Sequence, residues 1–534
     1  MKKVFVVCFL LLFAVQANAK KEKVFFDGSY ARNSISFLVV NHNDRYDDLV
    51  NAAVDDYIEG KFDFITANDK FDYNDLDIKT IEVNYPRQIN SANSEVSSPK
   101  VPYTTEEVQT WISDLNLGKE IISFWFSRTS DGKMNEQRVL ERGRLNATDQ
   151  DIRNAMATEI GKEMIAEQGY SLISRSYVVV LDAYAIGNYT RHGANVRKVS
   201  MFADIYVIDL QEGMLDDIFE NGWVYEGDDE ASARKKVEFY NQLQIPIKHV
   251  RSIDVTVQNA DIAFNNLSKS ALQQTEYSEI DCVAAAIDKV LSNKKMDEWK
   301  VVTPIMKVHP IQAKVGKKES VRNGQKFRAY RIVEDKNGNL SSKKSGQVRA
   351  ANKIIDNRGI ASGNTEPSEF YQISGKTVSP GMLLVEHRDL KMNFGVSAQI
   401  GGGGVVNANF SLGYLAWLNT FAGGRFAAYH YGLIDYTTNK IFTVGYGCGL
   451  RLIRNIELMP YLKFGIDQNN KFGVDGGLGL NLQVAYPMDI CLRVGGNSFV
   501  SSLISNGDGS VGEIAEDIAK SLPVYVTFGL RFNL

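Results

Sequence analysis

The last third of the chain alternates between apolar residues and polar or small residues, with a period of two, from about residue 392 to the final residue. The clearest segment is 524–534, whose outer residues would be Val526, Phe528, Leu530, Phe532 and Leu534. A segment of this length suits a tilted strand that crosses a membrane with its apolar face in lipid. The alternation would also fit a soluble, Gly-rich β-domain, because it does not distinguish lipid from a protein core.

The same alternation recurs upstream, so that eight strands are expected in all. The other seven lie near 392–400, 405–418, 420–433, 442–452, 456–466, 472–484 and 488–499. The connections at 453–455 and 486–489 are short, whereas the connection at 501–522 is long. Because transmembrane barrels have short periplasmic turns and longer outer loops, both ends of the barrel should face the periplasm.

Over residues 386–534 this series resembles the eight-stranded outer-membrane β-barrel family. The terminal Phe532-Asn533-Leu534 is similar to the C-terminal signal by which such barrels are inserted, although that signal normally ends in an aromatic residue. The resemblance implies an outer-membrane location, with outer-membrane lipid and the barrel-insertion machinery as partners.

Charged residues occupy several positions that would point into the barrel. An eight-stranded barrel is only wide enough for side chains to fill its interior. The charged residues expected in the lumen are Arg451, Glu457, Lys463, Asp467, Asp475, Arg493 and Arg531. They could line a polar conduit or form an ion-pair network, and the cost of an unpaired charge in a narrow interior favours the network.

The first residues have the pattern of a secretory signal peptide. Lys2 and Lys3 precede an apolar run at 4–15, and Ala17 and Ala19 form a small-x-small cleavage site. We therefore expect residues 1–19 to be removed on export. The formal net charge of −4 gives no reason to expect a nucleic acid as a partner.

Between the signal peptide and the barrel we expect an α+β periplasmic body followed by a small all-β module. The boundaries are an N-terminal α/β segment at 20–104, an α/β domain at 105–300 and a basic β-barrel module at 301–385. Period and capping patterns predict strands at 34–40, 176–185 and 199–210, and helices at 44–59, after Thr148 and after Ser278.

The all-β module is strongly basic. Between Lys314 and Lys353 there are twelve Lys or Arg residues and three acidic residues. This charge could contact anionic lipid headgroups or cell-wall polymer, or it could simply form a solvated face. The segments 320–327 and 346–350 also resemble the small C-terminal barrels of periplasmic flagellar and curli-type assembly proteins, which implies at most a scaffold role.

Residues that could carry chemistry are scattered. The six histidines have no metal-ligand spacing. Asp182, Asp204 and Asp209 on predicted strands could line a catalytic cleft, but strand-end or outward-facing carboxylates are the favoured interpretation. Cys448 and Cys491, both in predicted barrel strands, could pair or remain free thiols beside Cys282. We expect no catalytic residue, no cofactor and no metal site.

The sequence favours a non-enzymatic outer-membrane protein whose barrel anchors a large periplasmic region that binds or scaffolds an envelope partner. One alternative is an adhesin-like barrel that binds through its extracellular loops, chiefly 501–522. A second alternative is a conduit for small solutes, which the narrow lumen disfavours.

Overall fold

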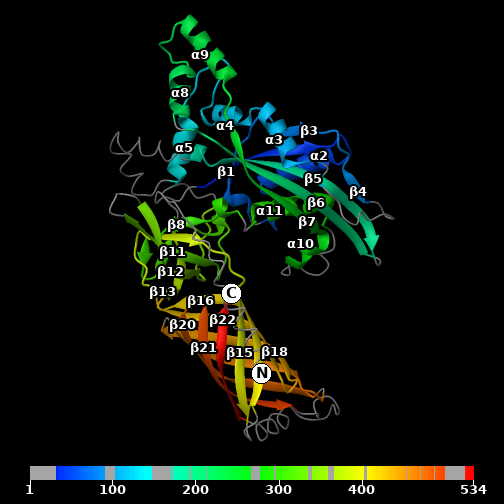
Figure 1. Cartoon of the computed structure of the whole chain (residues 1–534), viewed down its shortest axis with the longest axis vertical. Coiled ribbons are helices and arrows are strands. Elements are labelled where there is room, and N and C mark those ends of the chain that lie inside the picture. The colour runs from blue at the N-terminus through cyan, green and yellow to red at the C-terminus, as the bar shows by residue number, and fades with distance from the viewer. Residues whose placement is uncertain are drawn as a thin grey trace.

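The computed structural model contains three β-structures in chain order: a mixed sheet with helices, a curled sheet and a closed barrel (Figure 1). It describes residues 32–90, 101–146, 170–265, 277–334, 340–358, 366–401, 406–499 and 524–534, apart from isolated positions within these ranges. The expected α+β body, all-β module and eight-stranded antiparallel barrel are confirmed. The signal peptide, the helix after Thr148 and the loop at 501–522 lie outside the described residues.

A seven-stranded mixed sheet forms the centre of the N-terminal body, in the order β2-β1-β5-β6-β7, with β3 also paired to β1 and β4 to β5. The strands are β1 (Ser34–Asn41), β2 (Asp72–Tyr73), β3 (Thr80–Glu82), β4 (Gln88–Asn90), β5 (Ser176–Arg191), β6 (Ala194–Ile208) and β7 (Ile247–Gln258). Strand β1 runs parallel to β2, β3 and β5 and is buried along its whole length. Its centre, Phe37 to Val40, is an uninterrupted apolar run, as expected of a parallel strand that is covered on both faces.

Helices cover the two faces of this sheet. In β1, Ile35, Phe37 and Val39 join a core with α2 (Asp47–Ile58) and α11 (Glu279–Leu291), whereas Leu38 and Val40 join a second core with α3 (Thr105–Asp114) and α4 (Leu117–Trp125). Helix α11 begins with the capping box that Ser278 predicts. The other helices are α5 (Gln137–Asn146), α8 (Met214–Asn221), α9 (Glu230–Gln242) and α10 (Asn259–Asn265). Among the described residues, no helix is long and apolar enough to cross a membrane.

The module between body and barrel is a curled, seven-stranded antiparallel sheet in the order β8-β14-β11-β12-β13-β10-β9. Its strands are β8 (Val302–Pro304), β9 (Lys307–Val308), β10 (Ile311–Ala313), β11 (Lys326–Glu334), β12 (Leu340–Ala350), β13 (Ser368–Gly375) and β14 (Leu383–Glu386). Phe327, Val348 and Phe370 form its core. In the described part of the chain β8 and β9 do not pair, so the expected small barrel is a half-barrel.

The C-terminal barrel is closed by pairing of its first and last strands, β15 and β22. Its strands are β15 (Met392–Gly401), β16 (Val406–Phe421), β17 (Phe426–Thr437), β18 (Phe442–Ile453), β19 (Ile456–Ile466), β20 (Phe472–Ala485), β21 (Met488–Phe499) and β22 (Val524–Asn533). The half-barrel lies between the body and one end of this barrel (Figure 1).

The barrel has its apolar side chains outside and its polar side chains inside. On β22, Phe528 is 61% exposed and Thr527 only 2% exposed. Val526, Leu530 and Leu534 are also exposed, and Phe532 is partly exposed. A continuous exposed apolar wall is what a lipid-facing barrel requires.

Candidate functional site

Two layers of ion pairs fill the barrel lumen. In the layer nearer the half-barrel, Glu457 accepts hydrogen bonds from Arg451 Nε at 3.2 Å and Arg531 Nη1 at 2.8 Å. Arg531 also donates to Asp489, at 2.7 and 2.9 Å. All four side chains are buried, and Glu457 is 1% exposed. Two cations and two anions leave this layer without net charge.

The second layer lies deeper in the barrel and has the same balance of charges. Lys463 Nζ lies 2.6 Å from Asp435 and 2.7 Å from Asp475, and Arg493 lies 3.1 Å from Asp435. Tyr525 donates a hydrogen bond to Asp475, and its hydroxyl lies 2.7 Å from that of Tyr461. Here too, two carboxylates balance two cations, as burial of charge demands.

The structure places six of the seven predicted lumen residues in these layers: Arg451, Glu457, Lys463, Asp475, Arg493 and Arg531. The expectation for Asp467 is wrong. Strand β19 ends at Ile466, so the alternation no longer applies, and the Asp467 carboxylate accepts hydrogen bonds from the backbone N–H groups of Asn469 and Lys471 in the following turn.

Sequence reasoning missed Asp435 and Asp489, which complete the two layers. Both lie at positions that point inward by the period of their strands. The sequence predicts the strand of Asp435 at 420–433, whereas the structure has it at 426–437, so Asp435 lies two residues beyond the predicted end. Asp489 lies on β21 four residues before Arg493, so the same alternation that predicts an inward Arg493 also predicts an inward Asp489.

The half-barrel is seated on the mouth of the barrel. The Asn323 amide donates to the carbonyl oxygen of Leu418 and accepts from its N–H, both at 2.7 Å, and thus pairs with β16 as a neighbouring strand would. Arg451 Nη1 donates to the carbonyl oxygen of Ile373 at 3.3 Å. Tyr371 packs edge-on against Tyr429, with ring centroids 6.3 Å apart. The half-barrel therefore covers the lumen at this end.

The contact between the half-barrel and the mouth of the barrel is called the seam below. Two residues of the basic stretch lie near it. Lys326 and Arg349 are buried and both pair with Asp389, with Lys326 Nζ at 3.2 Å. Burial alone would raise the pKa of Asp389, but the charges of Arg349 and Lys326 outweigh it and lower the pKa. Arg331 and Lys343 are exposed on the β11–β12 hairpin, where contact with anionic lipid or cell-wall polymer stays a prediction.

The three carboxylates considered for a cleft do not form one group: Asp182 and Asp204 lie on the paired strands β5 and β6, whereas Asp209 follows the end of β6. Asp182 and Asp204 are buried, contrary to an outward-facing position, and Asp209 is exposed. Asp204 accepts a hydrogen bond from Ser252, and burial raises its pKa. Asp182 instead has His42 as its partner. In the described ranges, no group of three or more His, Cys, Asp or Glu side chains is arranged to hold a metal ion.

Asp182 belongs to a buried cluster in the body. His42 Nε2 lies 2.7 Å from one oxygen of Asp182, and Tyr103 donates to the other oxygen at 2.5 Å. His42 Nδ1 lies 2.6 Å from the carbonyl oxygen of Tyr85. Because both ring nitrogens face acceptors, the geometry favours the doubly protonated imidazolium. Burial would lower the pKa of His42, but its hydrogen bond and charge interaction with Asp182 outweigh burial and raise the pKa.

The raised pKa of His42 predicts that the body loses stability as pH increases. The pair contributes fully below the unfolded-state pKa of 6.5 and its contribution is lost as pH rises through the higher folded-state pKa. We expect the difference in unfolding free energy between wild type and His42→Gln to be larger at pH 6 than at pH 9. Urea denaturation, monitored by fluorescence, measures the two unfolding free energies. A difference that does not depend on pH would contradict a charged His42 paired with Asp182.

Of the two possibilities left open for Cys448 and Cys491, the structure shows free thiols, and Cys282 is free as well. Cys491 is buried and shares the inward parity of Asp489 and Arg493, whereas Cys448 shares the outward parity of the exposed Val444 and Tyr446. Side chains on opposite faces of a barrel wall cannot meet.

No family model matches the sequence, and no curated protein matches it. A solved structure described as "De novo design of transmembrane beta-barrels" aligns with 28% of this chain and 98% of that chain, at 10% sequence identity and a TM-score of 0.18. The class of the C-terminal region follows from its own strand pairing and surface: it is an eight-stranded antiparallel barrel of the transmembrane type, preceded by a large N-terminal region.

Proposed function

We propose that this is a non-enzymatic outer-membrane protein whose barrel anchors a periplasmic region that binds or scaffolds a protein of the envelope. The observation that supports it is the filled lumen. Asp435, Glu457, Asp475 and Asp489 each pair with buried cations inside the barrel. Opening a path for solutes would separate these pairs in a poorly hydrated interior, at several kcal/mol for each stranded charge.

The seated half-barrel supports the anchoring role as well. It covers one end of the lumen through the Asn323 contact to Leu418 and the Arg451 contact to Ile373. A barrel whose lumen is filled and whose mouth is covered can still hold the chain in the membrane. Its role is then to present the N-terminal region that precedes it. What precedes it is the mixed sheet with its helices, and this region is the one available to a partner.

The helices α8 and α9 are the part of the body that projects farthest from the barrel (Figure 1). In the loop between them Tyr225 is 46% exposed and stacks on Trp223, with ring planes 4° apart. Rigid, partly exposed aromatic residues are typical anchors of protein interfaces. This arm, residues 214–242, is the surface we assign to the partner.

A photo-crosslinking amino acid at Tyr225 of the full-length protein in cells should therefore give an adduct with an envelope protein. The matched control is the same substitution at Met306, which is 47% exposed but lies in the half-barrel. We expect no adduct at the control position. Absence of an adduct at Tyr225 and at other exposed positions of the arm, or steady ion conductance by the reconstituted protein, would contradict the proposal.

The adhesin-like alternative depends on residues 501–522, which lie outside the described residues, and no observation favours it.

A further inference from the structure

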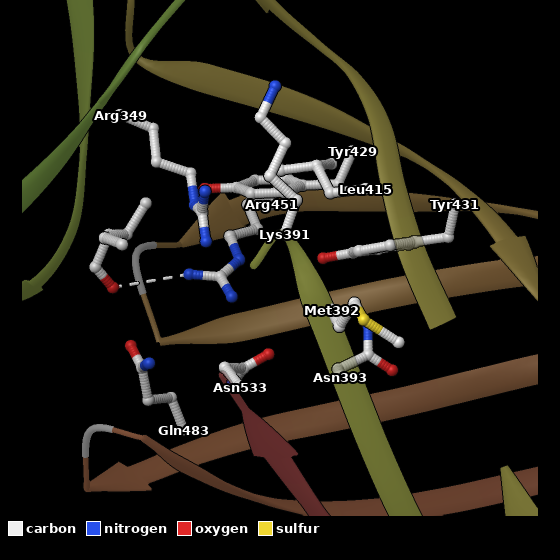
Figure 2. Close-up of a pocket in the computed structure, with 11 residues that line it drawn as sticks. Arg349, Lys391, Met392, Asn393, Leu415, Tyr429, Tyr431, Arg451, Gln483 and Asn533 are labelled. Carbon is white, nitrogen blue, oxygen red and sulfur yellow. Dashed lines mark hydrogen bonds between the residues drawn. The ribbon is translucent and has the colours of Figure 1, made fainter. Parts of the chain in front are cut away.

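A small cavity lies between the half-barrel and the mouth of the barrel (Figure 2). Three cationic residues line it: Arg349 from β12, Lys391 from the segment before β15, and Arg451 from β18. The lining residues, all of them described, include no carboxylate. The cavity is thus cationic on both sides of the seam.

The guanidinium groups of Arg349 and Arg451 end in the same space (Figure 2). Asp389, the partner of Arg349, also pairs with Lys326, so this group keeps a net positive charge. Arg451 shares Glu457 with Arg531, which also pairs with Asp489. Two buried positive groups that converge in one cavity repel each other more strongly than in water. An anion placed between them would turn this repulsion into attraction.

The hydroxyl group of Tyr429 is a second, independent sign of a ligand. Tyr429 is 2% exposed and lines the cavity, and its hydroxyl has no hydrogen-bond partner among the described residues. The guanidinium of Arg451 lies over its ring, 4.7 Å from the centroid. A buried hydroxyl without a partner is rare in folded proteins, and this one can donate to an oxygen placed in the cavity.

We propose that this cavity binds an oxyanion of the phosphate class, held by the guanidinium groups of Arg349 and Arg451 and by the hydroxyl of Tyr429. Guanidinium groups recognise phosphate oxygens through paired N–H donors. The side-chain amide of Gln483 also lines the cavity and can add a further donor. Because Arg349 belongs to the half-barrel and Arg451 to the barrel, the bound anion joins the two.

The phosphate group has two sources that share this chemistry. It is either free inorganic phosphate or the headgroup of an anionic phospholipid. The lining includes Met392 and Asn533, where the first strand of the barrel begins and the last strand ends. This places the cavity at the end of the lipid-facing wall, within reach of headgroups as well as solvent.

The test uses the full-length protein in dodecyl maltoside, a detergent without phosphate, titrated with inorganic phosphate and separately with phosphatidylglycerol. Binding is measured by calorimetry for the ion and by native mass spectrometry for the lipid. We expect at least one of them to bind the wild type and to raise its melting temperature. Binding of the ion identifies free phosphate as the source, and binding of the lipid alone identifies the headgroup.

Tyr429→Phe should weaken this binding about tenfold, because a hydrogen bond to a charged group is lost. Without ligand the variant should melt no lower than wild type, since it removes only an unpartnered hydroxyl. Tyr461→Phe is the matched control: its hydroxyl is bonded to Tyr525 in the other layer, and affinity should not change. If neither probe binds the wild type, or if Tyr429→Phe binds as tightly as wild type, the inference is overturned.

Discussion

Glu457→Gln should destabilise the barrel by about 3 to 5 kcal/mol, since it leaves the buried cations Arg451 and Arg531 without the carboxylate that they share. An amide of the same shape can still accept a hydrogen bond, but it supplies no negative charge. The layer then holds two cations and only Asp489. The urea concentration that abolishes heat-modifiable migration of the refolded barrel on a gel measures the loss.

Asp467→Asn is the matched control for this experiment. It makes the same acid-to-amide change in the same part of the chain, but in a turn where an amide oxygen can still accept from the N–H groups of Asn469 and Lys471. A surface change of this kind should stay within about 0.5 kcal/mol. Equal effects of the two substitutions would mean that the lumen layer does not depend on the charge of Glu457.

The barrel could be predicted from sequence because its period follows from strand geometry alone. Inward parity located six charged lumen residues, and it failed where a strand ended, at Asp467. Inward parity also fails within β16, because a bulge between Leu415 and Trp417 shifts the register. Beyond the bulge, the residues that point inward are those of the opposite parity. The alternation therefore predicts the turn before β17 near residue 419, whereas the structure places it at 422–425, with Gly423 and Gly424 at positive φ.

The seam between half-barrel and barrel could not be predicted in this way. Alternation tells which face of a strand is apolar, but not which loop packs on the mouth of a barrel. Asn323 and Leu418 are 95 residues apart, and their pairing depends on the curvature of two sheets. The orphan hydroxyl of Tyr429 is likewise visible only in three dimensions, because it arises from what the neighbouring side chains fail to reach.

The contacts of the carboxylates in the body could not be predicted from the sequence either. The sequence treats Asp182 and Asp209 alike, as acidic residues on or near strands. The structure buries Asp182 against His42 and Tyr103, which lie 140 and 79 residues away along the chain, and leaves Asp209 exposed. Removal of Asp182 therefore leaves both the buried imidazolium of His42 and the buried hydroxyl of Tyr103 without their partner.

Asp182→Ala should cost the body about 3 to 5 kcal/mol at pH 6, where His42 is charged. The cost should decrease at pH 9, because the neutral imidazole that remains is less expensive to bury. Asp209→Ala, the matched control, should change the unfolding free energy by at most about 0.5 kcal/mol at either pH. Urea denaturation of the full-length variants measures both, and a loss for Asp182→Ala that is as small as the control would show that the charged pair with His42 does not form.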